Sequence, residues 1–271
     1  MTVVALVGVP WDGSSTGERG AAGGPAAIRR ALWHPSSNPW NERGDDLSAA
    51  AVLEDRGDVE VSADAAETRA AIESGVRDTL AAGRRPLLLG GDHSITYPIL
   101  RAWASRAEPI SILHLDAHGD LYDSYDGDRF THASPFARIL EERLAGRLLQ
   151  VGVRTLNAHQ RSQASRFGVE SLGPDRWREA IPLIGRLKGP LYISLDLDVL
   201  EPMLAPGLSH PEPGGLAVRD VLELLAAVRT PIVGADIVEY NPALDLRDLT
   251  ARVAAKFVKE LVGVMRRSTG G

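Results

Sequence analysis

The sequence ISILHLDAHGD, residues 110–120, joins an apolar run typical of a buried strand to three potential metal ligands. The ligands Asp116, His118 and Asp120 stand at alternate positions. Alternate side chains of an extended chain point to the same side, so these two carboxylates and one imidazole can converge on one point. The stretch therefore predicts a metal site at the end of a strand.

Two further apolar runs end in the same way. LYISLDLD, residues 191–198, closes with two aspartates, and PLLLGGDHS, residues 86–94, reaches a histidine after a glycine pair. Paired acidic residues at the ends of apolar strands would repel one another strongly without a cation. We therefore expect the three strand ends to form one polar centre. Its candidate metal ligands are His93, Asp116, His118, Asp120, Asp196 and Asp198.

Strand and helix patterns alternate along the whole chain. The strand patterns cover residues 2–8, 86–89, 110–116, 148–153, 190–196 and 231–237, with a short edge strand within 52–61. The helix patterns cover residues 25–33, 62–83, 95–106, 135–145, 158–166, 175–187, 217–229 and 247–266, and Ser62 is the expected N-cap of the second. Nearly continuous apolar strands in such an alternation favour an α/β fold with a parallel sheet covered by helices on both faces. We see no linker or repeat, so residues 1–271 are predicted to form one domain.

The amino-acid composition excludes several classes of function. The net charge of -6 over 271 residues provides no electrostatic footprint for nucleic acid. The chain has no cysteine, so a metal site must use His and carboxylate ligands, which suit Mn, Fe, Mg or Zn. No apolar run approaches the length that spans a bilayer. The N-terminal MTVVALVGVPWDG is typical of a first strand and not of a signal peptide, so we expect a cytoplasmic protein without a membrane partner.

The six candidate ligands are more than one metal ion needs from a protein. Two ions about 3.5 to 4 Å apart would use them, with some aspartates bridging the pair. Such a pair binds a water and lowers its pKa toward neutrality, which gives a hydroxide able to attack an electrophilic carbon. The ligand set therefore favours a hydrolase.

Two more residues suit such a site. His132, in the polar segment after the first ligand cluster, can act as a general acid or proton shuttle. Glu239 follows the apolar run 231–238, where its carboxylate can pair with a planar guanidinium, although a surface salt bridge is an equally good interpretation. Among the other histidines, His114 is expected to support the site from the core. His210 is not assigned, although its loop can reach the pocket.

Taken together, six segments resemble the manganese-dependent ureohydrolases, the family of arginase, agmatinase, guanidinobutyrase and formimidoylglutamase. The segments are GGDHS at 90–94, DAHGD at 116–120, HASPF at 132–136, SLDLDVLEP at 194–202, APGLSHPEPGG at 205–215 and DIVEYNP at 236–242. They occur in the family's order and spacing across nearly the whole chain. One position departs from the pattern, because Glu201 stands before Pro202 where the family usually has Asp. We expect that change to affect the packing of the loop and not the metal ligands.

The resemblance implies a role for each site residue. One manganese would be held by His93, Asp116, Asp120 and Asp196, and the other by His118, Asp116, Asp196 and Asp198, with Asp116 and Asp196 bridging. Asp120 would also orient the bridging hydroxide, His132 would be the proton shuttle, and Glu239 would bind the guanidinium. The family fold is a three-layer α/β/α sandwich, and its members usually form trimers or hexamers.

The implied reaction is hydrolysis of a small cationic guanidino compound to urea and an amine. The loop LYDSYDGDRFT, residues 121–131, lacks the Thr/Ser/Asn-rich stretch of animal-type arginases and is closer to the agmatinase-like branch, which includes plant-type arginases. Agmatine and arginine therefore both remain open as substrates. The alternatives are a formimidoylglutamase that releases formamide, a guanidino-acid hydrolase such as guanidinobutyrase, a deacetylase-like amidase, and a non-catalytic assembly subunit. The complete ligand set argues against the last.

Overall fold

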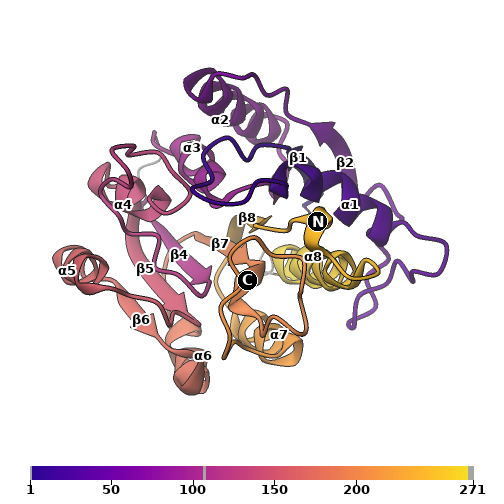
Figure 1. Cartoon of the computed structure of the whole chain (residues 1–271). Coiled ribbons are helices and arrows are strands. Elements are labelled where there is room, and N and C mark those ends of the chain that lie inside the picture. The colour runs from indigo at the N-terminus through magenta and orange to yellow at the C-terminus, as the bar shows by residue number, and fades with distance from the viewer. Residues whose placement is uncertain (1, 106–107, 268–271) are drawn as a thin grey trace.

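Eight parallel strands form one sheet in the computed structural model, which describes residues 2–105 and 108–267. The strand order is β2-β1-β3-β8-β7-β4-β5-β6 (Figure 1). All pairings between these strands are parallel. The strands are β1 Val4–Val9, β2 Leu53–Asp58, β3 Arg85–Gly90, β4 Ile110–Leu115, β5 Ala145–Val151, β6 Glu170–Leu172, β7 Leu191–Asp196 and β8 Ile232–Val238.

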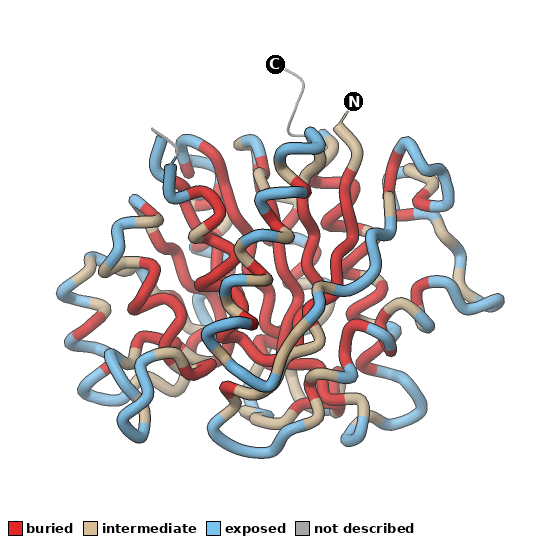
Figure 2. The backbone as a smooth tube through the Cα atoms, turned by 90° about the horizontal axis from the view of Figure 1, so that it is seen from above, coloured by how far each residue is buried: buried red, intermediate tan, exposed pale blue. Residues whose placement is uncertain are grey.

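Helices cover both faces of this sheet, so the predicted three-layer α/β/α fold is confirmed. The helices are α1 Gly24–Leu32, α2 Ala65–Ala81, α3 Thr96–Arg101, α4 Pro135–Glu141, α5 Ala158–Phe167, α6 Trp177–Ile184, α7 Val218–Ala227 and α8 Leu249–Arg267. Short 3-10 turns lie at Ala21–Gly23, His93–Ile95, Pro174–Arg176, Leu197–Val199 and Pro242–Leu244. Figure 2 shows the buried strands enclosed by helices that expose only their outer sides. Within the described ranges, no helix combines the length and apolarity that crossing a bilayer requires.

The two hydrophobic layers follow from the alternation of side chains along the strands. In β1, Val4 and Leu6 belong to the cluster that buries α1, α6, α7 and α8. Their neighbours Ala5 and Val7 belong to the other cluster, with α2, α3 and α4. Because both faces of each central strand are covered, the strand patterns are apolar throughout, as the sequence indicated.

The structure moves several predicted boundaries. The N-cap of α2 is Asp64, whose side chain accepts from the backbone N–H groups of Ala66 and Glu67, so the prediction of Ser62 was wrong. Helix α3 ends at Arg101, well before the predicted end at 106, a residue outside the described ranges. The strand β6 was not predicted, because a three-residue strand at the sheet edge leaves no apolar run in the sequence.

The candidate site lies where the central strands end. The strands β3, β8, β7 and β4 are consecutive in the sheet, and their carboxyl ends lead directly to the candidate ligands and to Glu239. The strands β7 and β8 end at the same height in the sheet, because their last residues, Asp196 and Val238, are paired. Ligands of open parallel sheets bind at this edge, so the fold places the candidate residues where binding is expected.

The carboxylate of Asp245 caps α8 and provides a test of the fold. It accepts from the backbone N–H groups of Thr250 at 3.0 Å and Ala251 at 3.1 Å, and from the Tyr240 hydroxyl at 2.8 Å. Burial alone would raise the pKa of Asp245, but these donors hold the pKa below its ordinary value. A carboxyl whose pKa is lowered by folding stabilises the protein above its unfolded pKa and loses that effect as the pH falls through its folded pKa.

We therefore expect Asp245→Ala to lower the free energy of unfolding at neutral pH by about 1 kcal/mol, as loss of a cap does. The difference from the original protein should shrink as the pH falls through the folded pKa. Urea unfolding of both proteins at a series of pH values measures it. A difference that is independent of pH would contradict the capping role of the charge.

Candidate metal centre and its pocket

His93 enters the site from the short turn that follows β3. Its ring is buried, and Nε2 donates to the Ser194 hydroxyl oxygen at 2.8 Å, because that hydroxyl itself donates to Asp236 at 2.7 Å. This chain of hydrogen bonds fixes the tautomer of His93, since the proton is held on Nε2. The Nδ1 lone pair is therefore free on the side of the ring that faces the aspartates.

Three carboxylate oxygens surround that lone pair. The Nδ1 atom of His93 lies 3.0 to 3.1 Å from one oxygen each of Asp116, Asp120 and Asp196, yet it is buried and has no hydrogen-bond partner in the described part of the chain. The negative potential at this point is strong: burial would lower the pKa of His93, but the carboxylates raise it well above its ordinary value. One nitrogen and three oxygens that converge on one point are a donor set suited to a divalent cation.

A second group of donors adjoins the first. The Nδ1 atom of His118 lies 2.7 Å from Asp198 and 3.5 Å from Asp116. Asp116 directs Oδ2 toward His93 and Oδ1 toward His118, so it lies between the two groups. Burial first, and then the charge of Asp116, raise the pKa of Asp198 to about 6. Burial and the charges of Asp198 and Asp116 likewise raise the pKa of Asp196 well above its ordinary value. The carboxylates are thus crowded in a way that a cation would relieve.

His114 supports this centre from the core, as predicted. Its Nε2 atom lies 2.6 Å from Oδ2 of Asp116, and its Nδ1 atom lies 3.0 Å from the Gln150 amide nitrogen. Because that amide can only donate, Nδ1 accepts and the proton of the neutral ring lies on Nε2, toward Asp116. The ring also packs against that of Phe136, with centroids 3.9 Å apart and the ring planes tilted by 32°. His114 therefore orients Asp116 from below the pocket.

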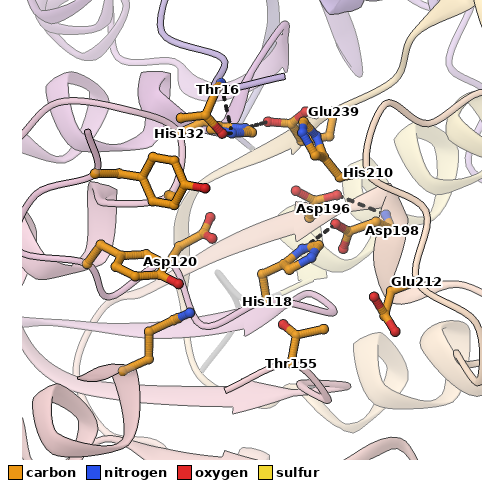
Figure 3. Close-up of a pocket in the computed structure, with 14 residues that line it drawn as sticks. Thr16, His118, Asp120, His132, Thr155, Asp196, Asp198, His210, Glu212 and Glu239 are labelled. Carbon is orange, nitrogen blue, oxygen red and sulfur yellow. Dashed lines mark hydrogen bonds and ion pairs between the residues drawn. The ribbon is translucent and has the colours of Figure 1, made fainter. Parts of the chain in front are cut away.

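His132 and Glu239 lie together on the far side of the pocket (Figure 3). The Nδ1 atom of His132 donates to Oε1 of Glu239 at 2.9 Å, because a carboxylate only accepts, and its Nε2 atom lies 2.8 Å from the Thr16 hydroxyl. Burial would lower the pKa of His132, but the charge of Glu239 and this hydrogen bond raise it to about 9. The ring is therefore held in a position and at a pKa suited to carrying a proton.

Glu239 has one engaged oxygen and one free oxygen. Its Oε1 accepts from His132 and, at 2.8 Å, from the backbone N–H of His93, whereas Oε2 is buried without a partner among the described residues. The backbone of Glu239 has a φ of 64°, a left-handed conformation that a non-glycine residue adopts uncommonly. Such strained positions cluster at functional sites. The unpaired carboxylate oxygen requires a donor, and a substrate can supply it.

These groups surround a cavity of about 290 Å³. Of the eight residues predicted for the site, six line this cavity. The other two, His93 and Asp116, are buried behind the lining residues. The lining residues are Thr16, His118, Asp120, Tyr122, Tyr125, His132, Ala133, Thr155, Gln160, Asp196, Asp198, His210, Glu212 and Glu239. The structure therefore brings all eight predicted residues to one place.

Several lining residues were not assigned from the sequence. His210 has its ring centroid 4.9 Å from that of His132, and its Nδ1 atom is buried without a partner among the described residues. Thr16 comes from the loop after β1, which closes over the site because the backbone of Gly91 packs against the Trp11 carbonyl where a Cβ atom would collide. The one signal in the sequence for these lining residues is that their loops follow apolar strands.

Glu201, the residue that departs from the family pattern, binds the loop that carries His210. The Oε2 atom of Glu201 accepts from the backbone N–H groups of Gly214 at 2.8 Å and Gly215 at 3.0 Å. Among the described residues, the side chain of Glu201 hydrogen-bonds to this loop and to none of the candidate ligands, which agrees with the expectation that this position concerns loop packing.

The comparison with known proteins agrees with the fold and the site. The model of the family described as "Arginase family" matches residues 2–263. The chain is 45% identical to "Arginase 1, mitochondrial" of Arabidopsis thaliana, with 95% of this chain and 79% of the relative covered. It is 35% identical to "Guanidino acid hydrolase, mitochondrial" of Homo sapiens, with 98% and 79% covered. The solved structure of an arginase from Medicago truncatula is similar with a TM-score of 0.91 and 40% identity, over 97% of this chain and 87% of that one.

The names of these relatives correct one expectation from the sequence. Both curated relatives are named as mitochondrial proteins, which contradicts the predicted cytoplasmic location. The N-terminal residues do form strand β1, as predicted. A strand at that position reports on the fold and carries no information about the compartment, so the inference was wrong.

Proposed function

This chain belongs to the arginase family of hydrolases, which act on guanidino compounds, and on that premise we propose that it cleaves such a compound to urea and an amine. The observation that carries the proposal is the unpaired Oε2 of Glu239 in a pocket that also contains the crowded aspartates. A guanidinium is planar, cationic and rich in N–H donors, and it supplies the partner that this buried oxygen lacks.

We assign the donors to two divalent metal ions. His93, Asp116, Asp120 and Asp196 would hold one, and His118, Asp116, Asp196 and Asp198 the other. The free Nδ1 lone pair of His93 among three carboxylate oxygens supports this assignment. Nitrogen and oxygen donors without thiolates suit Mn²⁺, which we propose as the metal. When bound, the two ions would activate a water for attack at neutral pH.

The protein's own residues then bind the substrate and move its proton. Glu239 would orient the guanidinium through Oε2, while Asp120, at the floor of the pocket, would orient the attacking water. His132 would be protonated at neutral pH because its pKa is raised to about 9. Its Nε2 carries the transferable proton, since Nδ1 is held by Glu239. That proton would pass to the leaving amine nitrogen.

Replacement of His132 tests the proton transfer. We expect His132→Asn to lower kcat about 100-fold, the usual contribution of a general acid, with a much smaller change in KM. The manganese content should be unchanged, because this ring is not an assigned ligand. Steady-state urea release and elemental analysis of the same preparation measure both quantities. Unaltered kcat would remove His132 from the mechanism.

The decisive experiment for the function follows urea release by the manganese-loaded protein. Agmatine, arginine and 4-guanidinobutyrate are assayed in parallel, and formiminoglutamate is followed by formamide release. Urea from one or more guanidino compounds is the expected result. Formamide as the main product would instead assign the formimidoylglutamase activity, and no product from any compound with both metals bound would reject the proposal.

We further propose that residues 1–271 form one domain and that the protein assembles as a trimer or hexamer. Proteins of this family are commonly homo-oligomers. Exposed apolar side chains such as Leu246, Leu249 and Met203 support an assembly that would cover them. Light scattering of the purified protein measures the mass.

A further inference from the structure

We propose that the outer part of the pocket selects substrates whose far end carries an ammonium group, and that Glu212 binds this group. The inference rests on the proposed function and specifies its substrate. Glu212 and Thr155 lie at the opposite end of the site from Glu239 and His132, with the aspartates between them (Figure 3). A substrate whose guanidinium lies at Glu239 therefore directs its other end toward Glu212.

The charges of the pocket wall favour a cation at this end. Among the described residues, five carboxylates line the cavity and no Lys or Arg does. Three of the carboxylates are assigned metal ligands, whose charge the ions would offset, and Glu239 is assigned to the guanidinium. Of these five described carboxylates, Glu212 is the one without an assigned partner. A ligand carboxylate here would be repelled by Glu212, whereas an ammonium would be attracted.

Glu212 is also unpaired within the protein. Among the residues that the structure describes, no hydrogen bond or ion pair involves its side chain, which is half-buried in the wall. The nearby cation, Arg154, is engaged elsewhere. Its Nη1 donates to the Gly152 carbonyl at 2.9 Å, and its Nη2 donates to the carbonyls of Asp198 at 2.8 Å and Glu212 at 2.5 Å. Arg154 thus fixes the backbone of Glu212 beside Asp198 and leaves the carboxylate free.

Two aromatic rings also belong to the wall of the cavity. Tyr122 and Tyr125 line the same cavity, and their ring centroids lie 5.2 Å apart in an edge-to-face arrangement. The Tyr122 hydroxyl accepts from the Asn157 amide at 2.7 Å, which holds its ring in place. Aromatic faces attract ammonium groups and offer no favourable contact to a carboxylate. The rings therefore add a surface to the cavity wall that favours a cation over a carboxylate.

This wall distinguishes among the candidate substrates. Agmatine and arginine both carry an ammonium group beyond their aliphatic chain. In 4-guanidinobutyrate the far end is a carboxylate alone, and formiminoglutamate ends in carboxylates without a free ammonium. We therefore expect agmatine or arginine to be turned over with a kcat/KM at least about tenfold above that of 4-guanidinobutyrate, as one charge-assisted hydrogen bond provides.

The test compares the original protein with Glu212→Gln, both loaded with manganese. The substrates are agmatine, arginine, 4-guanidinobutyrate and n-pentylguanidine, and in the last of these a methyl group replaces the ammonium of agmatine. The variant should raise KM for the preferred ammonium substrate about tenfold, change kcat less than about twofold, and leave KM for n-pentylguanidine unchanged. Equal losses on all substrates would show a structural role for Glu212 and overturn the proposal, as would preference for 4-guanidinobutyrate.

A matched control and a binding measurement complete the design. Asp126→Asn removes the same charge from an exposed position in the loop of residues 121–131. This control should leave every KM unchanged. Calorimetric titration with 1,4-diaminobutane, which has no guanidinium, should detect binding that Glu212→Gln weakens. This titration keeps the two proposals separate: absence of urea from every compound rejects the proposed function, whereas equal diamine binding to both proteins rejects the ammonium site.

Discussion

The Asp196→Asn variant should lose urea release and yet be more stable than the original protein when both are free of metal. Asp196 is buried, its Oδ2 lies 3.1 Å from Nδ1 of His93, and we assign it to both metal ions. Its loss removes several kcal/mol of interaction with the metals and the reacting group, so kcat/KM should fall on the order of 1000-fold. Manganese content should fall with it.

The gain in metal-free stability has a separate cause. Burial, followed by the charges of Asp198 and Asp116, raises the pKa of Asp196 well above its ordinary value. Its ionised form is therefore unfavourable in the folded protein unless a cation is present. The amide removes that charge, and its oxygen can still accept from the backbone N–H of Asp198, as Oδ1 does now at 2.8 Å.

Thermal unfolding with and without manganese separates the two effects. In chelator, a gain of about 1 kcal/mol would raise the Tm of Asp196→Asn by about 2 to 4 °C for a chain of this size. In manganese, the original protein should gain more than the variant, so the order of the two Tm values reverses. Asp78→Asn, an exposed aspartate on α2, is the control and should show neither change. A lower Tm for Asp196→Asn in chelator would contradict the inference that the charge of Asp196 destabilises the metal-free protein.

The sequence predicted the floor of the site well because the strands themselves determine it. Asp116, Asp196 and Glu239 stand at or just beyond the ends of apolar strands, and parallel strands bring such ends to one edge of a sheet. The local pattern therefore contains both the secondary structure and the position of the ligands. This is why all eight candidate residues converge although they span much of the chain.

The wall of the pocket could not be predicted in the same way. Thr16 and Glu212 lie in loops without periodicity, and long-range contacts bring them to the site. One loop is held by the close approach of Gly91 to Trp11, and the other by the hydrogen bonds of Arg154 to backbone carbonyls. None of these contacts leaves a spacing in the sequence. The wall, and not the floor, contacts the far end of the substrate. The residues that select the substrate could therefore be identified only from the structure.

The Glu239→Gln variant should lose activity as severely as Asp196→Asn while it retains its metal. The amide oxygen can still accept from the backbone N–H of His93 and from His132, as Oε1 does now, so the local fold is preserved. The amide NH₂ then takes the place of the free Oε2 and faces the N–H donors of the guanidinium. The loss of a buried charge-assisted pair and the opposition of donors should together lower kcat/KM on the order of 1000-fold.

The pH profile of the same variant gives a second, independent readout. The charge of Glu239 contributes to raising the pKa of His132 to about 9, so removing that charge should lower this pKa. Because His132 acts in its protonated form, the alkaline limb of the residual kcat profile should move to lower pH. Manganese content and the Tm gain in manganese should match those of the original protein. A variant that loses its metal would make Glu239 part of the metal site, whereas full activity with an unshifted profile would remove it from guanidinium binding.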